Sequence, residues 1–210
     1  MNAEEIFIPI GDITLPALLD VPGKAGGVVI FSHGSGSSRL STRNRFVAEI
    51  LHRKNFATLL FDLLTEEEDR IYENRFDIDL LTQRLISVTR WIKKIPGTKD
   101  LRTGYFGAST GSASALKAAS HLGNEIGAVV SRGGRPDLAG DIRGVTAPTL
   151  FIVGGLDTSV ILLNREASAH LTCVHEMRII EGASHLFEEK GKLSEVAKEA
   201  AEWYEKYLTA

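Results

Sequence analysis

The chain has 210 residues, of which 43% are hydrophobic and 24% charged, and its formal net charge is −3. This composition excludes a disordered chain, and the charge balance lacks the basic footprint of a nucleic-acid binder. No apolar run approaches the ~18 residues that span a bilayer, and the single cysteine, Cys173, permits neither an intrachain disulfide nor a cysteine-based zinc cluster. We therefore expect one domain over residues 1–210, located in the cytoplasm, with neither nucleic acid nor membrane as a partner.

Hydrophobic patterning predicts strands that alternate with helices along the chain. The predicted strands cover residues 4–10, 13–21, 27–32, 57–61, 103–108, 126–131, 149–153 and 176–180. The predicted helices begin near Ser41 and continue with residues 78–95, 111–121, 160–170 and 193–208. The first two strands form a hairpin, and the proline in each favours an edge position.

This alternation predicts an α/β domain with a mostly parallel sheet that helices cover on both faces. Ligands bind beyond the carboxyl ends of the strands in such sheets. The loops that we expect at that edge follow Ser32, Phe61, Ala108, Ser131, Val153 and Ile180. Reactive side chains are therefore expected in these loops.

The segment Gly107-Ala108-Ser109-Thr110-Gly111 follows a predicted strand and has the pattern Gly-x-Ser-x-Gly. Glycines at these positions allow a sharp turn between strand and helix, and the turn lifts the serine toward solvent. The pattern is weak evidence alone, because the chain holds 20 glycines. Ser109 is a candidate nucleophile if a base and an acid accompany it.

Two later loops supply these partners. Asp157 follows the predicted strand 149–153, and His185 follows the strand that ends at Ile180. The order Ser, Asp, His is that of α/β-hydrolases. His185 would act as general base and then general acid, and Asp157 would orient its imidazole.

An oxyanion hole would complete this site. The backbone N–H of Thr110, at the start of a helix, and the backbone N–H of Ser35, in the loop His33-Gly34-Ser35-Gly36, are the candidate donors. His33 is expected to brace this loop by a hydrogen bond.

These motifs resemble the α/β-hydrolase superfamily across nearly the whole chain, and the chain's brevity and loop sequences resemble its dienelactone hydrolase-related branch. Residues 32–62, 104–111 and 131–137 are similar to small bacterial hydrolase-like proteins that also occur fused behind phosphoribosyltransferase domains. The resemblance implies an α/β-hydrolase fold. True dienelactone hydrolases carry cysteine where this chain has Ser109, so lactone hydrolysis by the cysteine route does not transfer.

Several arginines follow strands at the predicted active edge. Arg39, Arg132 and Arg135 are candidate substrate-binding residues, because cations near a helix N-terminus are unfavourable unless an anion lies nearby. A carboxylate-bearing substrate would supply that anion. The acidic run Glu66–Asp69 would supply it equally, although a solvated face is the simpler interpretation of that run.

The remaining polar residues carry structural expectations. Asp62 is expected to make a structural hydrogen bond. The other histidines, His52, His121, His170 and His175, are expected on helices or their ends as surface or capping residues. The loop between Ser131 and Pro148 is too short for a helical cap, so an open site without a cap domain is expected.

The leading hypothesis is a serine hydrolase, free of cofactor and metal, that cleaves a small ester, lactone or thioester through an acyl-Ser109 intermediate. The alternative from another class is a catalytically silent α/β-hydrolase-fold protein with a binding or regulatory role. A lyase or transacylase with the same triad is a third hypothesis. The sequence leaves the oligomeric state and the natural substrate open.

Overall fold

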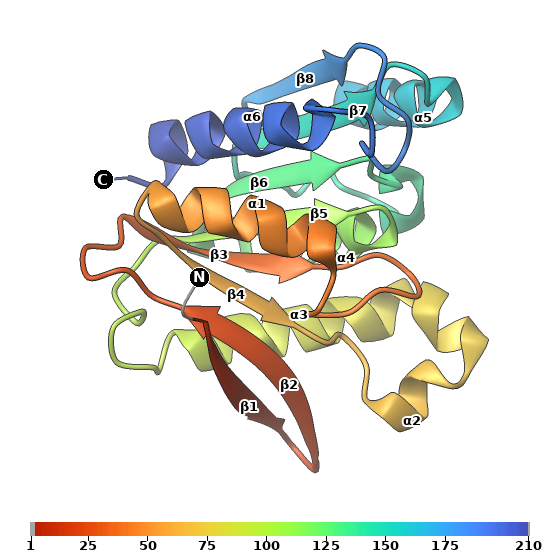
Figure 1. Ribbon diagram of the computed structural model, residues 1–210. Coiled ribbons are helices and arrows are strands. Elements are labelled where there is room, and N and C mark those ends of the chain that lie inside the picture. Colours follow the sequence, from red (N-terminus) through yellow and green to blue (C-terminus); the bar gives the residue numbers. More distant parts are fainter. Residues whose placement is uncertain (1–2, 210) are drawn as a thin grey trace.

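A computed structural model describes residues 3–209 as an eight-stranded sheet with helices on both faces (Figure 1). Its strands are β1 Glu4–Ile10, β2 Ile13–Asp20, β3 Gly27–Ser32, β4 Phe56–Phe61, β5 Thr103–Ala108, β6 Ile126–Arg132, β7 Thr149–Gly154 and β8 His175–Ile180. Its α-helices are α1 Thr42–Arg53, α2 Glu66–Asp69, α3 Ile78–Ile92, α4 Thr110–Leu122, α5 Thr158–Ala169 and α6 Lys192–Tyr207. Short 3₁₀ helices cover Tyr72–Phe76, Gly123–Glu125 and Pro136–Ala139.

The strand order is β1-β2-β4-β3-β5-β6-β7-β8. Strands β3 to β8 are parallel, whereas β2 pairs antiparallel with both of its neighbours, β1 and β4. The chain passes from β3 to β4 on one side, and β5 to β8 are added on the other side of β3. The loops that follow β3 and β5 therefore diverge and leave a crevice at the carboxyl end of the sheet. His33 follows β3 and Ser109 follows β5, so both residues lie at this switch point.

Two apolar layers cover the sheet, and each packs different helices against it. Helices α3 and α4 pack on one face through residues such as Leu85 and Leu116. Helices α1 and α6 pack on the other face through residues such as Leu51 and Tyr204. Figure 1 shows α1 and α6 side by side, away from α3. Strands β3, β4, β5, β6 and β7 are buried along their whole length, as their β-branched and aromatic sequences predict.

The predicted mostly parallel α/β architecture is confirmed, and three local predictions are wrong. Strand β2 lies between β1 and β4, so Pro16 is not on an edge strand. Strand β2 pairs with β4 only over residues 17–20, so Pro16 lies just outside this ladder. The Pro16 carbonyl accepts a hydrogen bond from the Asp62 N–H at 3.1 Å, and this contact does not require the N–H that proline lacks. The helix predicted over residues 78–95 ends earlier, at Ile92, where Thr98 Oγ1 donates to the Ile92 carbonyl. His175, expected on a helix or at a helix end, begins strand β8.

The connection between Ser131 and Pro148 contains only the 3₁₀ helix Pro136–Ala139, so this connection adds no helical cap. Within residues 3–209, none of the helices has the length and hydrophobicity needed to cross a bilayer.

Candidate active site

Ser109 occupies the turn between β5 and α4 with a φ of +52° and a ψ of −122°. This backbone conformation is strained for a residue other than glycine, and it persists where the surrounding structure enforces it. A Cβ on Gly107 would lie 2.5 Å from Ser112 Cα, and a Cβ on Gly111 would overlap the Ser32 carbonyl. The two glycines therefore permit the close packing of β3, β5 and α4 that holds Ser109 at the crest of the turn.

Asp157 and His185 are joined by a hydrogen bond of 2.6 Å between Asp157 Oδ2 and His185 Nδ1. Asp157 precedes the first residue of α5 at the carboxyl end of β7, and His185 lies in the loop between β8 and α6. The Asp157 side chain is 13% exposed and that of His185 is 38% exposed. The carboxylate is thus sheltered, while the imidazole reaches the surface.

The loop that follows β6 connects this pair to Ser109. The Ser109 N–H donates to the Arg132 carbonyl at 3.1 Å, and the Arg135 N–H donates to the Ser109 carbonyl at 3.1 Å. A Cβ on Gly133 would lie 3.4 Å from His185 Cε1. Residues 132–135 are therefore in contact with both the Ser109 turn and His185. The structure contains no hydrogen bond from the Ser109 hydroxyl to His185, and such contacts are often long before substrate binds.

The two candidate oxyanion donors are close together but differ in their partners. The Ser35 N–H donates to Thr110 Oγ1 at 2.8 Å, so this backbone donor is already occupied by a side chain. Thr110 is the first residue of α4, where a backbone N–H has no partner inside the helix. A Cβ on Gly34 would lie 3.1 Å from Ser109 Cβ, which places the loop after β3 directly against the Ser109 turn.

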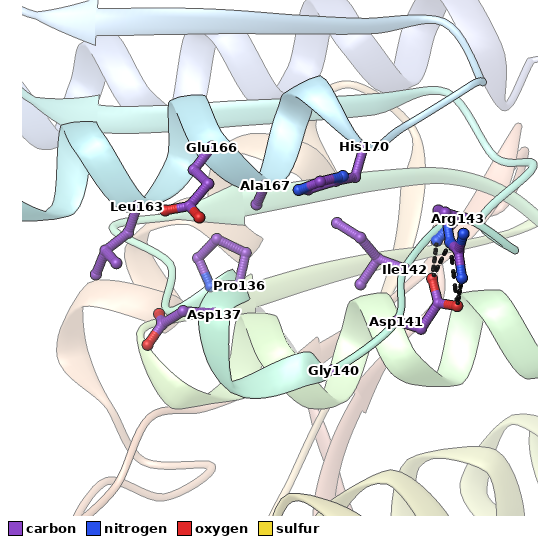
Figure 2. A pocket seen from close by; sticks show the side chains of 10 residues that line it. All are labelled: Pro136, Asp137, Gly140, Asp141, Ile142, Arg143, Leu163, Glu166, Ala167 and His170. Atoms are coloured by element: carbon purple, nitrogen blue, oxygen red, sulfur yellow. Dashed lines mark hydrogen bonds and ion pairs between the residues drawn. The ribbon is translucent and has the colours of Figure 1, made fainter.

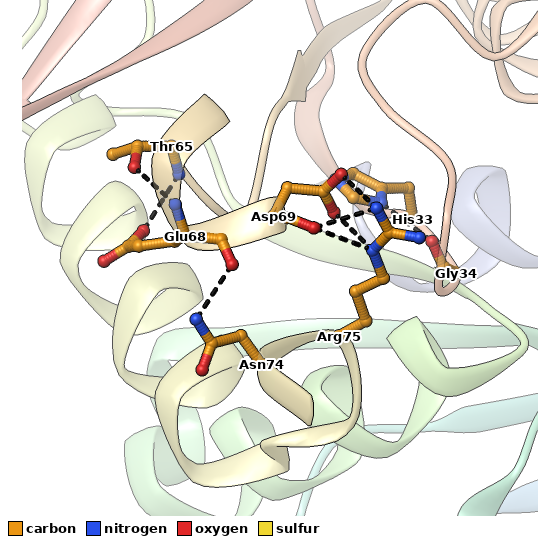
Figure 3. Close-up of polar contacts among 7 residues, drawn as sticks. All are labelled: His33, Gly34, Thr65, Glu68, Asp69, Asn74 and Arg75. Atoms are coloured by element: carbon orange, nitrogen blue, oxygen red, sulfur yellow. Dashed lines mark hydrogen bonds and ion pairs between the residues drawn. The ribbon is translucent and has the colours of Figure 1, made fainter. Parts of the chain in front are cut away.

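His33 braces that loop, as the sequence predicts. Its Nε2 accepts the Leu63 N–H at 3.1 Å, so Nδ1 carries the proton and donates to the Gly34 carbonyl at 3.0 Å (Figure 3). Burial lowers the pKa of the His33 imidazole below its ordinary 6.5, against opposing effects from the Gly34 hydrogen bond and from Asp62 and Asp69. The neutral ring therefore connects the loops that follow β3 and β4.

Two of the three candidate arginines are paired with carboxylates of the chain itself. Arg39 Nη1 donates to Asp62 at 2.7 Å and Arg39 Nη2 to Glu5 at 2.8 Å, which gives Asp62 the structural role predicted for it. Arg135 binds both carboxylate oxygens of Asp137, at 2.9 and 2.7 Å. Both guanidinium groups are therefore paired with carboxylates of the chain, although the buried Arg39 Nε has no partner within residues 3–209.

Arg132 is different, because it is only 6% exposed and no carboxylate of residues 3–209 lies within hydrogen-bonding distance of it. Its Nη2 donates to Asn44 Oδ1 at 3.3 Å, its guanidinium carbon lies 5.8 Å from the centre of the Phe187 ring, and its Nε has no partner. Burial, together with nearby Arg43, lowers the pKa of Arg132 to about 10. The sequence predicts Arg132 as a candidate binding residue, but it does not predict the contact of Arg132 with Asn44. A single asparagine inside a predicted helix does not indicate which residue its side chain will bind.

The acidic segment 65–76 is held in place by its own Arg75 and by Arg84 of α3, and it lies next to the loop after β3. A capping box joins Thr65 and Glu68 at the start of α2. Arg75 donates to the carbonyl and both carboxylate oxygens of Asp69, as Figure 3 shows. Glu68 also accepts a hydrogen bond from Arg84. The predicted solvated face is therefore only partly correct, since two of its four carboxylates hold the segment in place.

Two cavities flank the candidate site. One, of about 420 Å³, lies between the first hairpin, the loop after β3 and α2, and His33, Arg39 and Asp69 are among its lining residues. The other, of about 460 Å³, lies between the 3₁₀ helix Pro136–Ala139 and α5 (Figure 2). Its lining combines apolar and charged side chains and includes none of the candidate residues Ser109, Asp157 and His185. Within residues 3–209, no group of three or more histidine, cysteine, aspartate or glutamate side chains is placed to hold a metal ion.

Comparison with known proteins identifies the family. No family model matches the chain. A crystal structure of a dienelactone hydrolase from Anabaena variabilis is 49% identical in sequence, covers 99% of this chain and 100% of that chain, and gives a TM-score of 0.94. The chain belongs to the dienelactone hydrolase family of α/β-hydrolases. An α/β serine hydrolase without a lid from Xanthomonas campestris shares the fold, with 20% identity, coverage of 99% of this chain and 96% of that chain, and a TM-score of 0.80.

Longer relatives carry another name. Two Mycobacterium tuberculosis proteins, each called "Putative phosphoribosyl transferase", are 53% identical to this dienelactone hydrolase family member over 209 residues. The match covers 99% of this chain and 47% of each relative, so the chain spans about half their length. These findings confirm the predicted resemblance, and the family membership supports a hydrolase activity.

Proposed function

We propose that this protein is a serine hydrolase that cleaves a small ester, lactone or thioester through an acyl-Ser109 intermediate. The observation that carries the proposal is the hydrogen bond of 2.6 Å between Asp157 and His185, placed across the 132–135 loop from Ser109 in its strained turn. A carboxylate that orients an imidazole beside a raised serine is the arrangement of a nucleophilic triad.

The proposed reaction begins with proton transfer from the Ser109 hydroxyl to His185 Nε2 as Ser109 Oγ bonds to the carbonyl carbon. Asp157 fixes the tautomer, because its carboxylate accepts the Nδ1–H and leaves Nε2 free to take the proton. The tetrahedral intermediate then collapses, the bond to the leaving oxygen or sulfur breaks, and the imidazolium donates its proton to the leaving group. Water repeats the sequence on the acyl-enzyme and releases the carboxylic acid.

The negative charge on the tetrahedral intermediate develops at the N-terminus of α4. The partial positive charge of the helix end and the N–H of Thr110 favour an anion there. None of these steps draws on a cofactor. We retain the cytoplasm as the proposed location and a small molecule as the proposed partner.

The serine at the turn separates this protein from dienelactone hydrolases that use cysteine. We therefore propose ester chemistry in general and do not assign a dienelactone as substrate. The absence of a helical insertion between β6 and β7 favours substrates that reach the site from bulk water, since this connection adds no cap.

A substrate panel tests the proposal. Purified protein is assayed with p-nitrophenyl esters, lactones and thioesters, and Ser109→Ala and His185→Ala are measured beside the exposed-serine control Ser194→Ala. We expect hydrolysis of at least one class by wild type and by Ser194→Ala, with a loss of ~10⁴-fold or more in the two triad variants. Equal rates for wild type and Ser109→Ala would refute the proposal, and inactivity of folded wild type on the panel would favour the silent binding protein.

A further inference from the structure

The hydroxyl of Thr110 occupies an unusual position beside the candidate nucleophile. Thr110 follows Ser109 directly and is only 4% exposed. Its Oγ1 lies 2.8 Å from the backbone nitrogen of Ser35, in the exposed loop that passes over the start of α4. The side chain therefore stands where the loop after β3 meets the nucleophile turn.

The hydrogen bonds of this threonine leave two donors without an acceptor. The hydroxyl can accept and also donate, and its accepting role is filled by the Ser35 N–H. Among residues 3–209, no hydrogen bond has the Thr110 hydroxyl as donor to a protein acceptor, and none uses the Thr110 N–H. Both donors belong to the residue next to Ser109.

A two-backbone oxyanion hole, with donors from Ser35 and Thr110, conflicts with this arrangement. The Ser35 N–H would have to abandon Thr110 Oγ1 before it could bind a substrate oxygen, whereas an oxyanion hole works best when its donors need no reorganisation. The hydroxyl is already oriented, because the Ser35 N–H fixes its accepting side. A hydroxyl that accepts one hydrogen bond also becomes a better donor of the next.

We propose that Thr110 supplies both oxyanion donors, the backbone N–H and the side-chain hydroxyl, and that the Ser35 N–H holds and polarises this hydroxyl. The inference rests on the proposed serine-hydrolase function and assigns Thr110 Oγ1 a direct catalytic contact. Helix α4 fixes the position of the Thr110 N–H, and the loop after β3 fixes that of the Thr110 hydroxyl. The proposed oxyanion hole therefore depends on the segments that follow both β3 and β5.

Side-chain substitutions test this assignment, because they leave the Thr110 N–H in place. Thr110→Val removes the hydroxyl at nearly constant shape, Thr110→Ala removes it with less bulk, and Thr110→Ser restores it. Thr82→Val is the matched control, since Thr82 Oγ1 is buried on α3 without a hydrogen-bond partner. For each protein, the second-order rate constant for labelling by a fluorophosphonate is measured together with kcat and KM for a p-nitrophenyl ester. Thermal unfolding monitors folding.

We expect Thr110→Val and Thr110→Ala to lower kcat and the labelling rate by ~10²-fold with little change in KM, because an oxyanion donor acts on the transition state. Thr110→Ser should stay within about tenfold of wild type, and Thr82→Val should equal wild type. If the fluorophosphonate labels wild type and labels Thr110→Val equally fast, the assignment of Thr110 is overturned, while the proposed serine-hydrolase function stands. A Thr110→Ser loss as large as that of valine would also overturn it, since packing would then explain both. Unlabelled wild type would overturn the proposed function, and the assignment with it.

Discussion

Asp157 and His185 are separated by 28 positions in the chain, yet their side chains form a hydrogen bond of 2.6 Å. Parallel strands β7 and β8 bring the two residues together, because each residue follows its strand at the same edge of the sheet. The Asp157 carboxylate is largely buried and the His185 imidazole is not. The carboxylate can therefore hold the imidazole in an orientation in which its other nitrogen is free to exchange a proton.

Replacement of this carboxylate tests its orienting role. Asp157→Asn should lower kcat by ~10⁴-fold with KM little changed, because an amide cannot hold the imidazole in the required tautomer. The measurement is steady-state hydrolysis of the best ester. Asp141→Asn, which breaks an exposed ion pair with Arg143, is the control and should retain full activity. A loss of less than tenfold for Asp157→Asn would contradict the role of Asp157.

The turn that carries Ser109 depends on Gly111. Gly111→Ala should destabilise the protein by ~3 kcal/mol or more, because its Cβ would overlap the backbone carbonyl of Ser32, which cannot move aside cheaply. Urea denaturation followed by circular dichroism measures the change. Gly23→Ala is the control, since nothing lies within 4 Å of a Cβ there, and it should change the free energy of unfolding by less than about 0.5 kcal/mol. Similar stabilities for the two variants would contradict this account of the turn.

The lowered pKa of His33 should make the free energy of unfolding depend on pH. Because burial lowers its pKa in the folded protein below 6.5, the unfolded chain takes up a proton first as pH falls. This contribution to the free energy of unfolding is complete above pH 6.5 and decreases as pH drops from 6.5 toward the folded pKa, by at most ~1.4 kcal/mol per pH unit. His33→Gln should reduce the slope of stability against pH below 6.5, measured by urea denaturation. An unchanged slope would show that His33 does not titrate in this way.

The charge preference for substrate tests the arginines. Arg135 already binds both oxygens of Asp137, so Arg135→Ala should change kcat/KM for a carboxylated ester and for its neutral analogue equally, within about twofold. Matched ester pairs measured with wild type and variant give the ratio. A tenfold fall in the preference for the carboxylated ester would instead assign Arg135 to anion binding.

Sequence patterning predicts the backbone framework because the framework depends on local signals. The β-branched run 27–32 forms a strand with those bounds, and Ser41 caps α1 by accepting the Asn44 N–H. The order Ser109, Asp157, His185 places all three residues at one edge, because each follows a parallel strand. These features need only periodicity, capping and chain order.

Such local patterns do not predict features that depend on side-chain contacts between elements distant in the sequence. The Ser35 N–H and Thr110 Oγ1 are 75 positions apart, and Arg132 and Asn44 are 88 apart. Both contacts depend on the side-chain conformations that packing selects. The inner position of Pro16 likewise depends on where the β2 to β4 ladder stops. The sequence therefore predicts Ser109, Asp157 and His185 as candidate site residues, but it does not predict that the Ser35 N–H binds Thr110 Oγ1.

The most direct test of the central claim is covalent labelling by a fluorophosphonate, followed by peptide mass spectrometry. We expect one modified residue, Ser109, in folded wild type, and no modification in Ser109→Ala or His185→Ala, because the attack needs both the hydroxyl and its base. Folded wild-type protein that resists the probe, or that carries the label on another serine, would contradict the assignment of Ser109 as the nucleophile.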